Sequence, residues 1–363
     1  YRVQAPLTTN TYIGGGFRND FYGSNPNLKP ERTRTYEAGV ALQFFKNRLS
    51  LDLNYYRSRT VDQLIAPRVS QATGFILQYI NGGVVTNEGQ EVSLSGTPVR
   101  TSTGFTWDIN ANFYHNTNNV ESLPSPLTVV YQSDAFVTDV HEGGAFPNRP
   151  ISGLAASDFN RVTDPSSPYF GQVIVGATGY PSANATFIYA GNRAPRFTTQ
   201  LTNTFTYKGL SLTSLLDFRV GGVVVNGNDW YQTGVGTSNR TLDRYNTVVF
   251  DGVVATRDAS GNTTYAPNTR PVELNQTYYT TILARTGTAF IEDGSWARLR
   301  YVALSYALPQ RWLGGASSFL KGVELSVTGR NLVLLTKYSG ADPETASAGA
   351  GVRGGGSGGI DFG

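Results

Sequence analysis

The feature that most constrains this chain is a strict alternation of apolar and polar residues, which recurs in several segments. From Phe105 to Phe113 the odd positions are Phe, Trp, Ile, Ala and Phe, and the even positions are Thr, Asp, Asn and Asn. Successive side chains of a β-strand point to opposite faces, so this pattern predicts a strand with one apolar and one polar face. The alternation predicts eight strands, at 35–44, 49–55, 90–98, 105–113, 196–207, 210–220, 296–308 and 322–334.

The lengths of these strands favour a membrane protein. Most of them span about 10 to 13 residues, which is the length that a tilted strand needs to cross a bilayer, whereas strands of soluble sandwiches average about five or six. Several apolar faces end in aromatic residues, such as Phe44 and Phe45 or Tyr55 and Tyr56. Such rings form girdles at membrane interfaces. On strand chemistry alone, a large soluble β-protein with an aromatic core is the alternative.

The connections between the strands are sorted by length. Short connections lie at 46–48, 100–103, 208–209 and 309–321, and they alternate with long ones at 60–89, 117–195 and 221–295. Outer-membrane barrels have short periplasmic turns and long extracellular loops, whereas a soluble sandwich has no reason to sort its loops by side. We therefore predict an all-β fold that is part of a transmembrane antiparallel up-and-down β-barrel.

Composition excludes several classes of function. Lys and Arg number 29 and Asp and Glu 26, so the net charge is only +3, and no nucleic-acid partner is expected. The chain has no cysteine and only two histidines, His115 and His141. We expect neither an enzyme nor a cofactor. Asp139, His141 and Glu142 could hold a cation, but a solvated loop is the favoured interpretation, so no metal site is predicted.

Four sequence motifs are more specific than composition. They are N-P-N-L-K-P-E at 25–31 before Y-E-A-G at 36–39, I-N-G-G at 80–83 with N-E-G at 87–89, E-D-G-S-W-A-R-L-R at 292–300, and G-R-N-L at 329–332 with G-A-D-P-E at 340–344. In this order they resemble the C-terminal barrel of TonB-dependent outer-membrane transporters. The first motif is widespread among these receptors, and the third and fourth together look like the SusC/RagA type of the Bacteroidetes.

The resemblance implies a function and a set of partners. It implies import of an oligosaccharide or peptide through the outer membrane of a Gram-negative, Bacteroidetes-like bacterium, without catalysis. The implied partners are a SusD-like surface lipoprotein, the TonB complex acting through an N-terminal plug region absent from this chain, and outer-membrane lipid or lipopolysaccharide. A siderophore or vitamin receptor of the wider group and a non-transporting structural or adhesive barrel are the alternatives.

The strand directions suggest that the chain is a piece of such a barrel. With short turns in the periplasm, both ends of the chain would lie outside the cell, so we expect missing strands at each end. The expected division is an extracellular loop segment at 1–30, a C-terminal portion of the transporter barrel at 31–334, and a Gly-rich extracellular loop at 335–363 before a missing closing strand.

Candidate site residues follow from this topology. The inward polar row of the strands would line the lumen of a transporter or the water channel of a porin; it comprises Glu37, Asp52, Asn54, Asp108, Asn110, Asn112, Asp217, Arg219, Glu324 and Arg330. Aromatic residues of the long loops could stack on a sugar or anchor a peptide, with amides nearby, although packing of the loops is the favoured alternative. These loop residues are Trp230, Tyr231, Tyr278, Tyr279 and Tyr131, with Asn226, Asn228 and Asp229 beside them.

Arg298 and Arg300 form a further candidate pair. They share parity with Val302, whose side is predicted to face the lipid, and they lie near the extracellular rim. There they could pair with lipopolysaccharide phosphates, because guanidinium groups bind phosphate through two parallel hydrogen bonds. A β-bulge would instead turn them inward.

Overall fold

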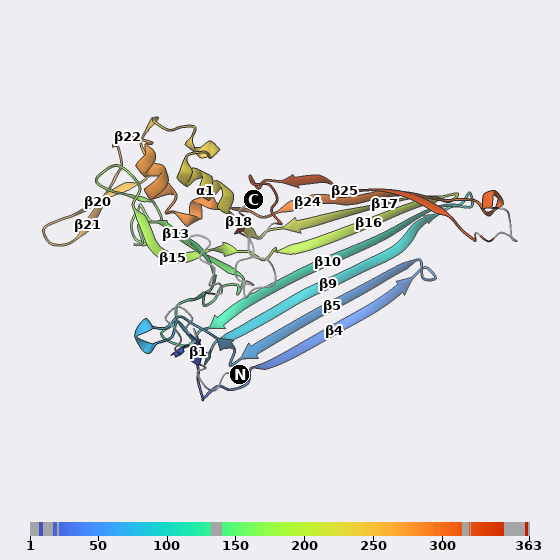
Figure 1. Ribbon diagram of the computed structural model, residues 1–363, viewed down its shortest axis with the longest axis horizontal. Coiled ribbons are helices and arrows are strands. Elements are labelled where there is room, and N and C mark those ends of the chain that lie inside the picture. Colours follow the sequence, from blue (N-terminus) through green and yellow to red (C-terminus); the bar gives the residue numbers. More distant parts are fainter. Residues whose placement is uncertain are drawn as a thin grey trace.

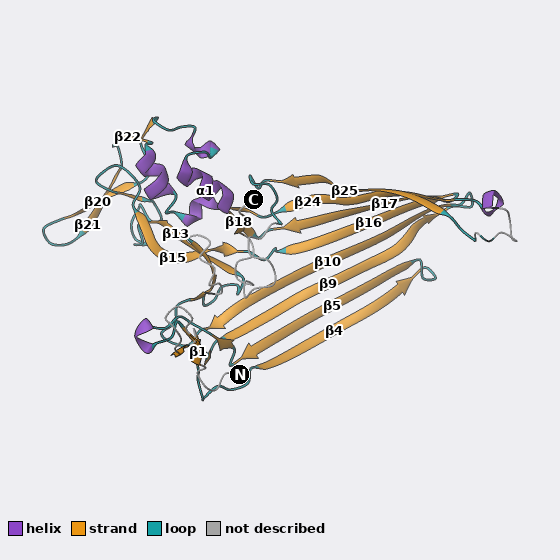
Figure 2. Ribbon diagram, in the orientation of Figure 1, coloured by secondary structure: helices purple, strands orange, loops and turns teal. Residues whose placement is uncertain are grey.

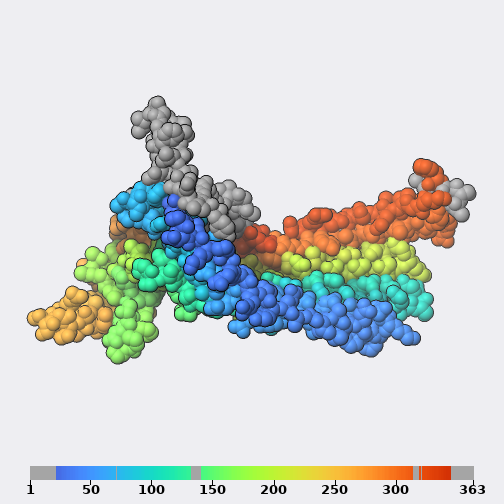
Figure 3. Space-filling view, turned by 90° about the horizontal axis from the view of Figure 1, so that it is seen from below, coloured from blue at the N-terminus to red at the C-terminus, as the bar shows by residue number. Residues whose placement is uncertain are grey.

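The computed structural model describes residues 7–9, 17–19, 22–131, 140–313, 319, 321–344 and 360–361. The molecule consists of a long sheet and a layer of loops gathered at one end of it (Figure 1). The space-filling view shows the same division, with the strands extending away from the loop layer (Figure 3).

Eight long strands form one antiparallel sheet. They are β4 (Arg32–Phe44), β5 (Leu49–Val61), β9 (Val84–Arg100), β10 (Phe105–Ser122), β16 (Phe197–Tyr207), β17 (Leu210–Val220), β24 (Trp296–Ala307) and β25 (Glu324–Thr336). Each pairs with the next along the chain, in the order β25-β24-β17-β16-β10-β9-β5-β4. All eight predicted strands are confirmed. Strands β9 and β10, with 17 and 18 residues, are longer than expected because both continue into the loop layer.

Short turns join the strands at the end away from the loop layer (Figure 2). The tightest is Lys208-Gly209, whose φ angles are 47° and 85°. Two positive φ angles in succession define the hairpin turn whose twist matches that of the flanking strands. A β-carbon at Gly209 would lie 2.9 Å from the carbonyl oxygen of Ala307, so both the backbone conformation and the space require glycine. Helix η5 (Gln310–Leu313) lies in the last of these connections.

The loop layer has secondary structure of its own. One small sheet contains β11 (Val130–Tyr131), β12 (His141–Ala145), β13 (Gly153–Phe159) and β15 (Ala183–Asn192), a second contains β14 (Ile174–Val175), β20 (Val253–Arg257) and β21 (Thr263–Pro267), and a third contains β18 (Val223–Asn226), β23 (Ile291–Asp293) and β26 (Ile360–Asp361). The helical elements are η1 (Gln71–Thr73), α1 (Gly227–Val235), η2 (Asn239–Thr241), η3 (Tyr278–Leu283) and η4 (Gly287–Phe290). The two-stranded pairs are β1 (Leu7–Thr9) with β2 (Phe17–Asn19), β3 (Tyr22–Gly23) with β7 (Leu77–Gln78), β6 (Leu64–Ile65) with β8 (Ile80–Asn81), and β19 (Thr247–Val248) with β22 (Val272–Glu273).

Most of the buried apolar side chains belong to this layer and not to the long sheet. Phe290, Leu154, Val225 and Val253 are fully enclosed there. Among the described residues, no helix is both long enough and apolar enough to span a membrane.

The long sheet exposes an apolar face. Directly opposed residues of antiparallel strands share a face, and the pairs Val40–Leu53 and Leu42–Leu51 continue the apolar side of β4 onto β5. Tyr36 is 66% exposed and Val327 is 76% exposed. Soluble proteins rarely expose an apolar surface of this extent, whereas the lipid-facing side of a membrane barrel is apolar throughout. Since β4 and β25 are the edges of the sheet among the described strands, the fold is a partial barrel.

Candidate functional site: the polar face and its rim

The opposite face of the long sheet is largely polar. One row of opposed residues runs through Ala41, Asp52, Ser93, Asn112, Gln200, Asp217 and Arg298. The strand registers place all the predicted lumen residues on this face: Glu37, Asp52, Asn54, Asp108, Asn110, Asn112, Asp217, Arg219, Glu324 and Arg330. Their common face is therefore established, and their contact with a lumen stays a prediction.

Amide and hydroxyl groups on this face bond to one another. Asn112 accepts a hydrogen bond from Ser93 (2.5 Å) and donates one to Asn110 (2.9 Å). Nearer the loop layer, Asn116 donates to the Tyr56 hydroxyl and to the Asn87 amide oxygen, both at 2.8 Å. Groups of this kind hydrogen-bond neutral sugars and peptides as readily as water.

The placement of Arg298 and Arg300 toward lipid is wrong. Leu299 pairs with Val333 and Tyr301 pairs with Arg330, so the register shifts at Arg300. The neighbouring pairing with β17 shifts at the same point. A β-bulge inserts one unpaired residue into a strand. The residues before the bulge therefore point to the opposite face from the one that the alternation after it predicts. Arg298 consequently lies opposite Asp217 on the polar face, as the alternative interpretation requires.

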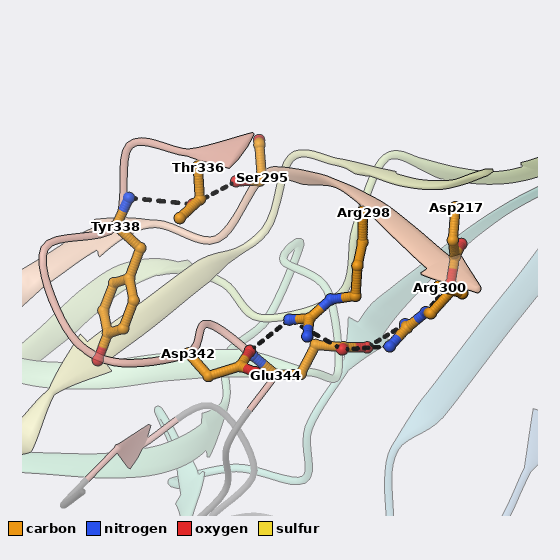
Figure 4. Close-up of polar contacts among 8 residues, drawn as sticks. All are labelled: Asp217, Ser295, Arg298, Arg300, Thr336, Tyr338, Asp342 and Glu344. Carbon is orange, nitrogen blue, oxygen red and sulfur yellow. Dashed lines mark hydrogen bonds and ion pairs between the residues drawn. The ribbon is translucent and has the colours of Figure 1, made fainter. Parts of the chain in front are cut away.

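The two arginines anchor the segment that follows β25 (Figure 4). Arg298 Nη2 lies 2.7 Å from Asp342 Oδ1 and 3.2 Å from Glu344 Oε2. Arg300 donates to both oxygens of Glu344, at 2.7 and 2.6 Å, and its Nε donates to Asp217 at 2.8 Å. The Trp296 ring lies against both guanidinium groups, 5.4 Å and 4.9 Å from their central carbons. We call Asp217, Arg298, Arg300, Asp342 and Glu344 the rim network.

Burial makes the loss of one partner of this network costly. Arg298 is 7% exposed, so its charge depends on the acidic partners for compensation. Burial by itself raises the pKa of Asp342, but the hydrogen bond from Arg298 and the positive charges of Arg298 and Arg300 outweigh it and leave that pKa below its ordinary value. Asp342 is therefore ionised at neutral pH.

Further hydrogen bonds hold the same segment. Glu292 accepts from the backbone N–H and from the hydroxyl of Ser339, both at 2.7 Å, and from the Asn226 amide at 3.0 Å. Thr336 donates to the Ser295 carbonyl at 2.8 Å. The third and fourth sequence motifs are thus joined in space, because the acids of G-A-D-P-E bind the arginines of W-A-R-L-R. The sequence contained both motifs but no signal that they pair.

The predicted loop aromatics lie in two places. Trp230 donates to the Ala284 carbonyl at 2.8 Å and packs beside Tyr278, Tyr279 and Phe290. Tyr279 is buried, whereas Tyr231 on α1 is 62% exposed. Asn228 accepts a hydrogen bond from Gln232, and Asn226 and Asp229 belong to the N-terminal cap of α1. Contact of these residues with substrate stays a prediction.

Tyr131 lies apart from that cluster, at a cavity of about 400 Å³. Its ring meets Phe187 edge-on and the guanidinium of Arg68. The stacked rings of Tyr22 and Tyr79, 5.0 Å apart, line the same cavity. Tyr22 and Tyr79 were not predicted from the sequence as residues of this cavity, because nothing in the sequence places the segment at 22–23 beside the one at 77–79.

Both histidines make hydrogen bonds to backbone carbonyl groups. His141 is 2% exposed and its Nε2–H donates to the Gly287 carbonyl at 2.6 Å, while Glu142 pairs with Arg68 at 2.8 Å. Asp139 lies outside the described residues. His115 contacts the Arg196 carbonyl. Within the described part of the chain, no three His, Asp or Glu side chains are grouped as a metal site requires.

Residues 3–195 match the family described as TonB dependent receptor-like, beta-barrel. The chain belongs to this family. The predicted resemblance to TonB-dependent transporters is confirmed, and with it an outer-membrane location. The family is not enzymatic, which agrees with the prediction that the chain is not an enzyme.

Relatives of this TonB-dependent receptor barrel come from the Bacteroidetes. It is 27% identical to TonB-dependent receptor P3 of Formosa agariphila over 355 residues, which cover 92% of this chain and 32% of that protein. It is 24% identical to SusC of Bacteroides thetaiotaomicron, over 94% of this chain and 33% of SusC. A solved structure of the RagAB peptide transporter matches 99% of the fold with a TM-score of 0.66 at 23% identity, over 37% of that chain. The barrel chain thus spans about a third of these relatives' length.

The buried imidazole gives the loop layer of this receptor barrel a dependence on pH. Burial lowers the pKa of His141 to about 4. The unfolded loop binds a proton below about pH 6.5 and the folded loop does not, so stability is complete above pH 6.5 and falls as the pH drops toward 4. We expect a loss of about 2 kcal/mol at pH 5. Hydrogen exchange of the peptides around β12 and β13, corrected for intrinsic rates, should show the loss in the parent and not in His141→Gln.

Proposed function

We propose that this chain is part of a SusC/RagA-type transporter that imports an oligosaccharide or peptide through the outer membrane in a TonB-dependent manner. The observation that carries the proposal is the two-faced sheet in a chain of the TonB-dependent receptor family. Its apolar face meets lipid, and its polar face ends beneath the loop layer. Such a face lines an aqueous path once the barrel is complete.

The proposed partners are a SusD-like surface lipoprotein and the TonB complex. The names of the relatives support the proposal: one is the TonB-dependent receptor SusC, and the solved structure is that of the RagAB peptide transporter. In this proposal the loop layer is the part of the barrel that meets the lipoprotein, and TonB acts through a plug region outside this chain. Outer-membrane lipid surrounds the apolar face.

The chemistry of the polar face favours a neutral, hydrogen-bonding substrate. Asn54 on β5 and Asn110, Asn112 and Asn116 on β10 offer amide donors and acceptors along the polar face. Sugar hydroxyls and peptide groups match these amides, whereas a ferric chelate would gain little from them. The predicted lumen residues line the path in this proposal, and the loop aromatics contribute to binding at its mouth.

Uptake measurements test the function. The gene for the complete protein is deleted, and cells are offered labelled oligosaccharides, peptides and ferric siderophores with and without an active TonB complex. We expect loss of uptake of one oligosaccharide or peptide class, in deletion and TonB-deficient cells alike. Loss restricted to siderophores would favour the receptor alternative. Unchanged uptake of all three would favour a structural or adhesive barrel.

Tyr231 offers a sharper test of the loop aromatics. Its ring is exposed on α1, so Tyr231→Ala removes a stacking surface without opening the loop core. An aromatic contact contributes about 1 kcal/mol, which predicts an apparent affinity for the substrate about fivefold weaker at unchanged protein level. The matched variant is Tyr231→Phe, which keeps the stacking ring and loses only the hydroxyl, and it should leave affinity unchanged. Equal affinity for Tyr231→Ala and the parent would exclude Tyr231 from the site.

A further inference from the structure

Four arginines cluster on the apolar side of the sheet, at the end of β4 and β5 nearest the loop layer. Arg34 lies opposite Arg59, and Tyr36 lies opposite Arg57, so these side chains share the face of Val40 and Leu42. Arg32 occupies the next outward position on β4. We call Arg32, Arg34, Arg57 and Arg59 the outer-rim arginine cluster. It differs from the rim network, which lies on the polar face.

The cluster lies at the level of lipid headgroups. The apolar positions of β4 run from Tyr36 to Phe44, which is about 26 Å of strand. At the tilt of a barrel strand this run covers most of the roughly 25 Å apolar band of an outer-membrane protein. Tyr36 and Tyr55 therefore mark the interface on the long-loop side, which is extracellular. Arg34 and Arg57 lie one outward position beyond them, where phosphates of the outer leaflet are found.

The arginines surround a cleft. Its volume is about 550 Å³, and its lining comprises the four arginines with Tyr36, Val61, Thr33 and Ser58. Six of these eight residues lie on the outward face, and one of them is the exposed Tyr36. A strand added at the free edge of β4 would lie beside the cluster in the plane of the sheet and would leave this face open.

Two of the four guanidinium groups keep their donors available. Arg59 and Arg32 form close pairs with Glu121 and Asp62, at 2.7 and 2.8 Å. Arg57 lies 3.9 Å from Glu88, beyond hydrogen-bond distance, and is 61% exposed. Among the described residues, none forms a hydrogen bond or ion pair with the side chain of Arg34. An anion in the cleft would meet the forked donors of Arg34 and Arg57, which no acidic side chain of the described residues hydrogen-bonds, although Glu88 lies within ion-pair distance of Arg57.

We propose that the outer-rim arginine cluster binds the phosphate of a lipid headgroup in the outer leaflet, with Arg34 and Arg57 as the principal ligands. A lipid fits better than free phosphate, because its acyl chains lie along the apolar face directly below Tyr36. The site is independent of the transported substrate, since it lies on the opposite face of the sheet. It replaces Arg298 and Arg300 as the lipid contact of this chain.

Binding of defined lipids by the complete protein in detergent tests the proposal. The probes are diphosphoryl lipid A, the same lipid without phosphate, and inorganic phosphate as competitor, with bound lipid quantified by native mass spectrometry. The variant Arg34→Gln/Arg57→Gln is compared with Lys46→Gln/Arg100→Gln, which removes two charges at the short-turn end. We expect the first to bind diphosphoryl lipid A about 25-fold more weakly and the second to bind like the parent. Phosphate-free lipid should bind parent and variants equally weakly.

Three results would overturn the proposal: equal affinity of Arg34→Gln/Arg57→Gln and the parent, an equal loss in the short-turn variant, or complete displacement by inorganic phosphate at concentrations equal to the lipid. The single variant Arg34→Gln breaks no hydrogen bond or ion pair of the described residues. It can therefore be measured in place of the double variant if the double variant does not assemble. It should bind about fivefold more weakly.

Discussion

Replacing Arg298 with alanine is expected to release the segment at 337–344 from the rim. The substitution removes the guanidinium group that pairs with Asp342 and leaves Glu344 paired with Arg300. Breaking one side of a buried ion pair costs roughly 3–5 kcal/mol, and the partial exposure of both acids places this case near 3 kcal/mol. Hydrogen-exchange protection of the segment should therefore fall about a hundredfold.

The control for this variant is Arg59→Ala. It removes a pair of similar length with Glu121, but both side chains are open to solvent, so only a small loss of stability is expected. The pH dependence provides a second check. Because the pKa of Asp342 is lowered in the fold, the anchor is complete above about pH 4 and weakens only as the pH falls through that lower value. Equal protection in Arg298→Ala and the parent would mean that the rim network does not hold the segment.

Replacing Leu51 with arginine is expected to prevent efficient assembly of the barrel. Leu51 lies on the apolar face of β5, opposite Leu42 and Leu94 and within the apolar run that extends from Tyr36 to Phe44 on β4. Arginine on the lipid face near the bilayer midplane costs roughly 2–4 kcal/mol. Urea unfolding of the reconstituted protein and the level of folded protein in outer membranes measure the effect.

The neighbouring substitution Asp52→Arg is the matched control. Asp52 lies on the polar face, opposite Ala41 and Ser93, so an arginine there meets the aqueous side and should leave the folded level close to that of the parent. If the two variants were equally defective, or if Asp52→Arg were the worse, the assignment of the two faces would be reversed or wrong.

The long sheet could be predicted from sequence because the alternation of apolar and polar residues is visible within each strand segment. Alternation fixes which residues share a face, and tight turns such as Lys208-Gly209 fix the register between neighbours. Every predicted lumen residue, from Glu37 to Arg330, consequently falls on one face. The division into short turns and long loops followed from spacing alone.

The rim could not be predicted in the same way. One unpaired residue at Arg300 reverses the parity of Arg298, and a bulge has no signature in an alternating sequence. The contact between Arg298 and Asp342 joins positions 44 residues apart, and only the fold brings them together. The loop layer likewise depends on long-range packing, as between Trp230 and Ala284.

Single cysteines placed along β5 and β10 test the central claim most directly, because this chain has no cysteine of its own. In the complete protein in outer membranes, a membrane-impermeant maleimide should label positions 52, 54, 110 and 112 and leave positions 51, 53, 109 and 111 unlabelled. Alternating labelling would establish a lipid-spanning sheet whose polar face lines an aqueous path. Uniform labelling of both sets, or labelling of the apolar set alone, would contradict it.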